Sequence, residues 1–410
     1  MIHLATNTWI KSSTAIIKII PFFLLAAFVF MPFAVLWIFI AGTAFYAAIS
    51  NTRPKKLAIL IFSLLVILLT PYMATKTGLS VVGNDKLQYT DFMYGLVNGN
   101  LFQIELGHPE IVSFTLLKIS AELFGPSNEA FATFFAISFI IFLIGIYRTD
   151  PRASLTFIML FLSSSVFFNI YGNGIRQGLA LSLFLVFISE IKTKKYFFLT
   201  LALLSHLSIG ALLPYIFLRR IIVGLDNKRV LAVCAASYLS GYAVMPLMEG
   251  FSSSWGYLER KRTLYMNYIS SETGIAKVTF LLLLTIVILT KSSFFRKLIK
   301  QNSRLSTKQQ FALDSLYSVT IYLSFLLFFV MQVMDFFARY YMYYLVFCVF
   351  YITVFIYNLD NTRYRAIGTF LIIVFSTASL IKSFLNFSLF YCGNSNEFLT
   401  DNIISVYMCM

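Results

Sequence analysis

Apolar runs of membrane-spanning length recur along almost the whole chain. A spanning helix needs about 20 mostly apolar residues, and 59% of the 410 residues are hydrophobic while 12% are charged. Because a soluble protein carries roughly 25% charged residues, a water-soluble fold could not bury this much apolar surface. We expect an all-α polytopic membrane protein, a single integral domain over residues 1–410 with about 10–12 transmembrane helices. The candidate spans are roughly 19–49, 57–73, 131–146, 154–170, 175–191, 196–218, 230–248, 276–290, 311–333, 340–358 and 366–390. The first is either one tilted helix or two pieces broken around Met31-Pro32.

The net charge of +15 is explained by the loops between these runs. Six loops hold 20 of the 32 Lys and Arg residues but only five of the 17 Asp and Glu residues. This clustering between apolar runs is typical of cytoplasmic loops, and nucleic-acid binding would need a basic face on a soluble domain. The basic residues are Arg53, Lys55, Lys56, Arg148, Arg152, Lys192, Lys194, Lys195, Arg219, Arg220, Lys228, Arg229, those from Lys291 to Lys308, Arg363 and Arg365.

The segment 196–218 lies between two of these basic loops. Both loops can be cytoplasmic only if the segment crosses the membrane an even number of times, and its length is too short for two crossings. The charge pattern therefore predicts a re-entrant or broken helix with His206 near its tip. The alternative is one ordinary crossing, which would place the basic run from Lys291 to Lys308 outside.

The remaining loops are acidic. Twelve of the 17 Asp and Glu residues fall in segments that this topology places outside. The loops 74–130 and 249–275 are expected to be extracytoplasmic, and 74–130 is expected to form a small outer-face subdomain. Its part Glu110–Leu123 has apolar residues at helical spacing and is a candidate interfacial helix.

One turn has the composition of an anion site. In Gly172-Asn173-Gly174-Ile175-Arg176-Gln177 a glycine-rich turn opens a helix with an arginine in its first turn. Helix N-termini attract anions, and a guanidinium adds a paired donor suited to phosphate. The turn is either a diphosphate clamp that includes Gln177 or a turn whose Arg176 reaches toward lipid headgroups.

Two further residues stand out in or beside apolar sequence. His206 is either a structural hydrogen-bonding group or part of a site, since a polar side chain is costly at that depth. Arg339 begins an apolar span at the predicted outer face. It either pairs with Asp335 four residues earlier or supplies a second phosphate contact.

The predicted outer loops supply the other candidates. Asp85 lies in a turn where an aspartate commonly bonds its own backbone. Glu110 is a candidate general base, together with Glu105 and His108. Arg262 belongs to a basic triplet that either lies in a solvated loop or contacts an anionic substrate. The spacing of these residues matches no metal-ligand motif, so we predict neither a metal nor a cofactor.

Several of these motifs resemble one family. Asn173-Gly174-Ile175-Arg176-Gln177, Lys194-Lys195-Tyr196 and Ser205-His206-Leu207-Ser208 resemble the EpsG-like and O-antigen polymerase (Wzy-type) proteins of bacterial surface polysaccharide assembly. Gly83-Asn84-Asp85 with Tyr89 and Arg339-Tyr340-Tyr341 are similar to further motifs of that family. The similarity runs from Gly83 to Tyr341 and is strongest over 172–218.

The resemblance implies a multi-pass protein of the bacterial inner membrane whose active site faces the periplasm. It implies a glycosyltransferase that joins oligosaccharide repeat units carried on undecaprenyl diphosphate, as in lipopolysaccharide biosynthesis. Both donor and acceptor would be lipid-linked, and a chain-length regulator is a further candidate partner.

The residue roles follow from that chemistry. Arg176 and Arg339 would stabilise the departing diphosphate, while His206, or else Asp85 or Glu110, would receive the proton of the acceptor hydroxyl. A lipid-linked polysaccharide ligase and a flippase or exporter of lipid-linked sugars are the alternatives.

Overall fold

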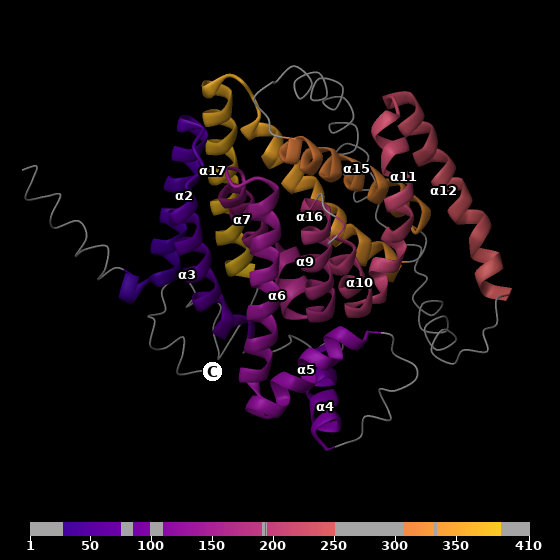
Figure 1. The fold of residues 1–410 in the computed structure, drawn as a ribbon, viewed down its shortest axis with the longest axis horizontal. Coiled ribbons are helices and arrows are strands. Elements are labelled where there is room, and N and C mark those ends of the chain that lie inside the picture. The colour runs from indigo at the N-terminus through magenta and orange to yellow at the C-terminus, as the bar shows by residue number, and fades with distance from the viewer. Residues whose placement is uncertain are drawn as a thin grey trace, which may run out of the picture.

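The computed structural model describes residues 28–74, 85–98, 110–190, 193, 195–250, 307–331 and 334–386. All regular elements in these ranges are helices (Figure 1). Seven of the helices are long and apolar enough to cross a membrane, or eight if one bent pair is a single span. The predicted class, an all-α polytopic membrane protein, is confirmed. The elements are α2 (Pro32–Ser50), α3 (Lys55–Ala74), α4 (Asp85–Val97), α5 (Ile111–Phe124), α6 (Asn128–Thr149), α7 (Ser154–Leu162), α8 (Ser165–Gly172), α9 (Ile175–Ser189), α10 (Lys195–Ser205), η2 (Leu207–Leu212), α11 (Leu213–Gly224), α12 (Asn227–Gly250), α15 (Thr307–Phe329), α16 (Met334–Tyr357) and α17 (Thr362–Asn386). The predicted span 276–290 and the loop 249–275, apart from the end of α12, lie outside the described residues.

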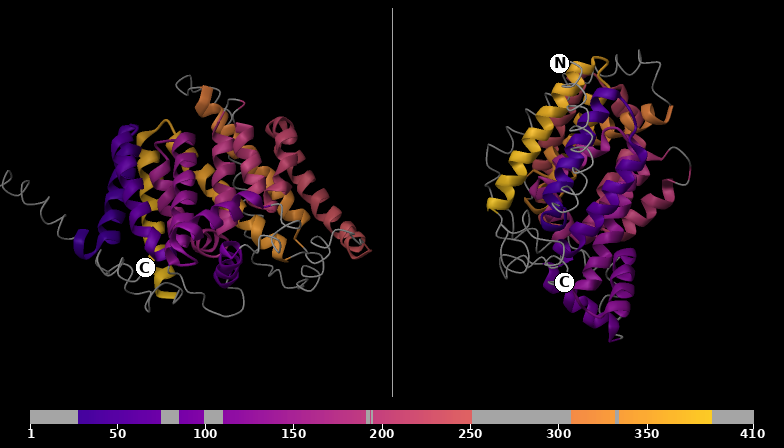
Figure 2. Two further views of the ribbon diagram at one scale, coloured as in Figure 1. Left: turned by 60° about the horizontal axis from the view of Figure 1, so that its bottom comes forward. Right: turned by 90° about the vertical axis from the view of Figure 1, so that its left-hand side faces the viewer.

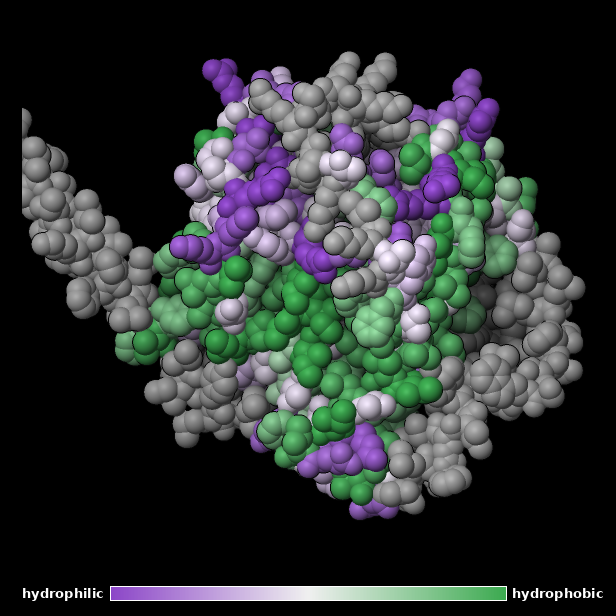
Figure 3. All heavy atoms as spheres, viewed as in Figure 1, coloured by the Kyte–Doolittle hydropathy of each residue, from purple (hydrophilic) through white to green (hydrophobic). Residues whose placement is uncertain are grey.

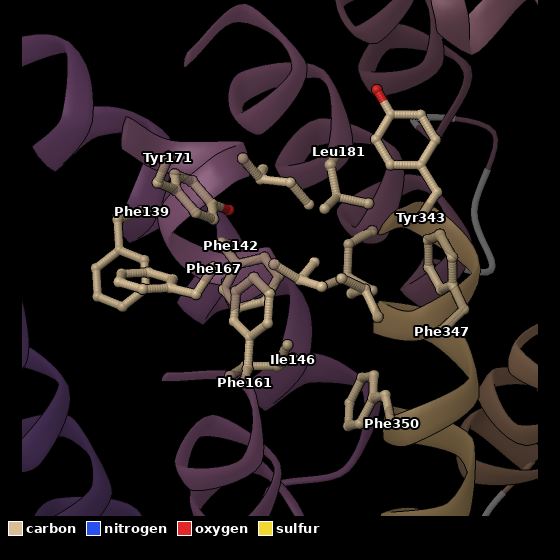
Figure 4. Close-up of a cluster of buried hydrophobic side chains, with 14 of the residues drawn as sticks. Phe139, Phe142, Ile146, Phe161, Phe167, Tyr171, Leu181, Tyr343, Phe347 and Phe350 are labelled. Carbon is tan, nitrogen blue, oxygen red and sulfur yellow. The ribbon is translucent and has the colours of Figure 1, made fainter. Parts of the chain in front are cut away.

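A core of aromatic side chains surrounds α9. Every residue of this helix except Arg176 is buried, and rings from α6, α7, α8 and α16 pack around it (Figure 4). Tyr171 is fully enclosed there and shares a hydrogen bond with Ser182 of α9 (2.7 Å between the hydroxyl oxygens). Since α9 is covered on all sides, the only side chain that it leaves partly accessible is the arginine at its start.

The basic loops meet at one end of the bundle. Arg152 is 7% exposed and donates to Asp150, to Asn51 Oδ1 (2.8 Å) and to Asn358 Oδ1 (3.0 Å), so it joins three loops. Arg148 pairs with Glu190, which brings the loop after α9 to the same place. Hydrophilic side chains gather at this end, above a band of hydrophobic ones (Figure 3). The prediction that these loops share one face holds for the five that the structure describes.

The break in the segment 196–218 is confirmed. Helix α10 ends at Ser205, His206 has extended backbone angles, and η2 and α11 follow. Lys195 at the start of α10 and Arg219 in α11 both lie over the ring of Phe311, with 5.3 Å and 4.0 Å from each cation to the ring centroid. The segment therefore enters and leaves at the basic end, as a re-entrant hairpin does.

The end opposite the basic loops carries α4 and α5, which project beyond the bundle (Figures 1 and 2). Helix α5 begins at Ile111, as the spacing of its apolar residues predicts, and it packs against α6 and α10. Helices α6 and α9 have 22 and 15 residues, and are thus about 33 Å and 22 Å long. Both reach the basic end, where Arg148 meets Glu190. The start of α9 consequently lies about 11 Å inside the far end of α6.

One predicted span needs correction, and the alternative left open for another is decided. The run 154–170, expected to be one helix, is bent by 83° between α7 and α8. The hydroxyls of Ser163 and Ser164 bond to carbonyls three residues earlier, and Ser379 of α17 donates to the carbonyl of Ser163 (3.0 Å). These side-chain bonds satisfy backbone groups that the bend leaves outside the helical pattern. The first apolar run is bent at Met31, and α2 begins at Pro32. The break therefore lies at Met31-Pro32, as the alternative of two pieces predicts.

Candidate active site

The centre of the site is Glu110, the residue before α5. Its side chain is 2% exposed and carries two separate sets of contacts. One carboxylate oxygen, Oε2, accepts a hydrogen bond from Arg176 at the start of α9. The other, Oε1, accepts one from the backbone N–H of Leu207 (3.1 Å) and lies 3.2 Å from Nδ1 of His206. Glu110 thus joins three segments that are far apart in the sequence.

Arg176 lies in the first turn of α9, as its sequence motif predicts, but its guanidinium is held by protein groups. Besides Glu110, its Nε donates to the hydroxyl of Tyr89 in α4 (3.3 Å). The guanidinium carbon is 5.3 Å from the ring centroid of Tyr89 and 5.2 Å from that of Phe114 in α5. A carboxylate and two aromatic faces fix the orientation of the cation, and its side chain remains 17% exposed.

Gln177 is buried and turns back toward the glycine-rich turn. Its Oε1 lies 3.0 Å from where a Cβ on Gly174 would be, so a side chain at position 174 would displace it. Gly178 is equally constrained, since a Cβ there would lie 3.0 Å from the carbonyl of Ile170. The glycines of this motif therefore allow α8 to approach the start of α9 closely.

His206 occupies the break between α10 and η2 and is 8% exposed. Its Nδ1 lies 3.1 Å from the backbone N–H of Ser208, a donor, and 3.2 Å from Glu110 Oε1, an acceptor. A single ring nitrogen either carries a proton or accepts one, so the two contacts correspond to different protonation forms. In the structure Nδ1 accepts from the N–H of Ser208, so the neutral imidazole carries its proton on Nε2. A proton on Nδ1 as well makes the imidazolium, which pairs with Glu110.

Two tyrosines of α16 hold the turn that follows His206. The hydroxyl of Tyr343 shares a hydrogen bond with that of Ser208 (2.9 Å), and the hydroxyl of Tyr340 donates to the carbonyl of Ser208 (3.2 Å). Tyr343 borders the aromatic cluster, and its hydroxyl points away from it (Figure 4). Arg339 lies one helical turn before Tyr343 in α16.

The predicted site residues thus divide into two groups. The structure brings Glu110, Arg176 and His206 together and places Arg339 on α16, the helix that contacts the turn after His206. The side chains of Asp85 and Asp335, together with all of Glu105, His108 and Arg262, lie outside what the structure describes.

Sequence reasoning missed the roles of Tyr89, Ser208, Tyr340 and Tyr343. A usable signal was present, because each of the four residues belongs to or adjoins a motif that carries the family resemblance.

Metal binding finds no support in the described ranges, where no group of three or more His, Cys, Asp and Glu side chains is placed to hold an ion. The electrostatics of the site come instead from one carboxylate, one guanidinium and one imidazole in largely buried surroundings. Charges interact strongly when water is excluded, and arrangements of this kind are frequent in active sites.

The fold and this cluster define a polytopic helical membrane protein with a Glu–Arg–His site recessed at the end away from its basic loops. A family model, that of the EpsG family, matches residues 60–399. The chain belongs to the EpsG family, and this membership supports a polysaccharide polymerase-like role. Comparisons with curated proteins and with solved structures find no match.

Proposed function

We propose that the protein is a polysaccharide polymerase that joins oligosaccharide repeat units carried on undecaprenyl diphosphate, as an O-antigen polymerase does. The observation that carries the proposal is the convergence of Glu110, Arg176 and His206 at one point in the fold. It supplies the two functions that transfer from a lipid diphosphate requires, a base for the acceptor and a cation for the leaving group.

The reaction forms one bond and breaks one. A hydroxyl oxygen of the acceptor sugar bonds to C1 of the donor sugar, and the bond from C1 to the diphosphate oxygen breaks. The diphosphate leaves with the electron pair, still attached to its lipid. The hydroxyl proton passes to the imidazole of His206, and the carboxylate of Glu110, 3.2 Å from Nδ1, stabilises the imidazolium that forms.

The cations serve the leaving group. Arg176 and Arg339 stabilise the negative charge that develops on the diphosphate as the bond to C1 breaks. In the structure Glu110 offsets the charge of Arg176. A diphosphate carries more negative charge than a carboxylate and competes with Glu110 for the guanidinium, which draws the carboxylate further toward His206.

The position of the site in the helical bundle agrees with substrates that are linked to lipid. The site is recessed by about 11 Å from the end of α6, on the side away from the basic loops, so a substrate anchored in the bilayer can reach it between helices. If the basic loops are cytoplasmic, this end faces the periplasm of a bacterial inner membrane. Both substrates would then enter laterally between helices.

The test is polymerisation by the purified protein. Lipid-linked repeat units are isolated from cells lacking this chain and incubated with the wild type, with Arg176→Ala and with Arg148→Ala. The last is a matched control, because Arg148 also pairs with a glutamate but at the basic end. The wild type and Arg148→Ala should give a ladder of chain lengths, whereas Arg176→Ala should leave single units.

A normal ladder from Arg176→Ala would contradict the proposed site. If the wild type makes no ladder from repeat units alone but attaches polymer to an added acceptor, the protein is a ligase. A flippase would catalyse neither transfer.

A further inference from the structure

Two positive charges lie beside one aromatic ring at the base of the re-entrant segment. The ammonium of Lys195, at the start of α10, is 5.3 Å from the ring centroid of Phe311 in α15, and the guanidinium carbon of Arg219 in α11 is 4.0 Å from the same centroid. Arg219 also donates to the carbonyl of Phe311 (3.2 Å). The ammonium of Lys195 is 5.2 Å and 5.8 Å from the ring centroids of Tyr196 and Phe187. Three helices therefore meet at this pair of cations.

The pair lacks the carboxylates that neutralise other cations at the basic end. Arg148 and Arg152 each form an ion pair with an acidic side chain. Among the residues that the structure describes, no carboxylate lies within ion-pair distance of Lys195 or Arg219. Aromatic faces attract cations but carry no net charge, so both positive charges remain uncompensated. Since both lie close to one ring, they are within a Debye length of each other (~10 Å at 0.1 M salt) and repel.

A phosphate group has the chemistry that this pair needs. Lysine binds phosphate as a point charge and arginine as a fork of two donors. Both side chains are half-buried, so an anion can reach them from outside the bundle. Basic pockets between helices at a membrane surface are typical binding sites for the headgroups of anionic lipids.

The surroundings favour a lipid over a free phosphate ion. Large apolar side chains next to the two cations in the sequence are exposed, with Phe197 of α10 at 63% and Phe217 and Ile221 of α11 at 80% and 59%. They form part of the apolar surface that acyl chains cover in a bilayer. The basic end also borders a band of hydrophobic side chains (Figure 3), as a headgroup site must.

We propose that Lys195 and Arg219 bind the phosphate of an anionic phospholipid in the leaflet at the basic end. The bound lipid links α10 and α11, the two arms of the re-entrant segment, to Phe311 of α15. The site lies about 16 Å along α10 from the break at His206, so it is separate from the candidate active site. It gives a role to the Lys194-Lys195-Tyr196 motif, and it does not depend on the proposed function.

The test is native mass spectrometry of the protein in neutral detergent, titrated with phosphatidylglycerol. The variant Lys195→Gln/Arg219→Gln should bind the first lipid at least about tenfold more weakly than the wild type, the effect of losing one charged hydrogen bond. Lys228→Gln/Arg229→Gln is the matched control, because it removes two exposed cations from the same end. The control should bind the lipid within about twofold of the wild type.

Two further variants keep the proposal testable if the double substitution prevents folding. Lys195→Gln alone leaves the contacts of Arg219 with Phe311 in place and should weaken binding in the same direction. Arg219→Lys keeps the charge and should bind more tightly than Arg219→Gln. Thermal unfolding without added lipid identifies the variants that are folded.

Competing ligands distinguish the sources of phosphate. Phosphatidylcholine, whose headgroup has no net charge, should bind at least tenfold more weakly than phosphatidylglycerol, and inorganic phosphate at 10 mM should not displace the bound lipid. Displacement by inorganic phosphate would overturn the assignment to a lipid. Equal affinity of the wild type and Lys195→Gln/Arg219→Gln would overturn the site itself, and so would an equal loss in the control. None of these measurements needs a glycosyl donor, so failure of the proposed function leaves this result unchanged.

Discussion

Replacement of Glu110 by Gln tests whether the buried pair serves chemistry or only stability. The change keeps the shape of the side chain but removes its charge, and its amide N–H₂ must face either Arg176 or the N–H of Leu207, both of which are donors. Breaking a buried ion pair by removing one partner costs about 3–5 kcal/mol. Because the Arg176 side chain is 17% exposed, we expect the lower end, about 3 kcal/mol.

A second substitution, at Arg176, shows whether the pair serves catalysis or only stability. In Glu110→Gln/Arg176→Met the uncompensated charge is gone, and the apparent melting temperature should recover most of the loss seen in either single variant. Polymerisation should stay at least about 100-fold below the wild type in all three variants, since neither His206 nor the leaving group keeps its partner. Thermal unfolding in detergent and chain-length ladders measure the two effects independently.

Glu190→Gln is the matched control. Glu190 pairs with Arg148, whose side chain is 33% exposed, so the expected loss is about 1 kcal/mol or less with normal activity. A double variant that regains activity along with stability would refute the reasoning, because the pair would then be a structural contact only.

Two further predictions concern the fold. Gly241→Ala should lower the apparent melting temperature strongly, by the equivalent of about 3 kcal/mol or more, since its Cβ would lie 2.3 Å from the carbonyl oxygen of Phe329 and α12 would have to move from α15. Gly42→Ala, whose Cβ meets nothing within 4 Å, should be neutral or stabilising; equal losses would contradict the close crossing of α12 and α15. In a cysteine-free background, Thr193→Cys and Glu122→Cys should react with a membrane-impermeant thiol reagent from opposite sides of the membrane, and labelling of both from one side would overturn the topology.

The sequence predicts the helical class and the break at His206 because both depend on local composition and on charge. The loops around 196–218 carry lysines and arginines on both sides, and both can be cytoplasmic only if the segment crosses the membrane an even number of times. The bend between α7 and α8 has no such signal. Three consecutive serines, Ser163 to Ser165, interrupt the apolar run there without any charge, and the partner that stabilises the bend, Ser379, is 216 residues away.

In the candidate site, too, some residues are predicted from local motifs, while the contacts between them depend on distant parts of the chain. Arg176 and His206 were identifiable from their motifs, and Glu110 was one of several carboxylates in a long loop. Its pairing with Arg176 spans 66 residues and its contact with Leu207 spans 97. No local pattern encodes such a contact, so the sequence could name these residues as candidates but could not predict that Glu110 joins the other two.

The interruption of the helix at His206 explains why the polar groups of the site lie together. A re-entrant segment leaves backbone N–H and C=O groups without helical partners at a depth where water is scarce. The fold supplies the partners from α5 and α16, and one of them, Glu110, is a carboxylate. A buried carboxylate in turn requires a cation, which the start of α9 provides in Arg176. The requirement for hydrogen bonds at the break therefore assembles a carboxylate, an imidazole and a guanidinium within contact distance. Substitutions here should affect folding and catalysis together unless, as in Glu110→Gln/Arg176→Met, the charge is removed in pairs.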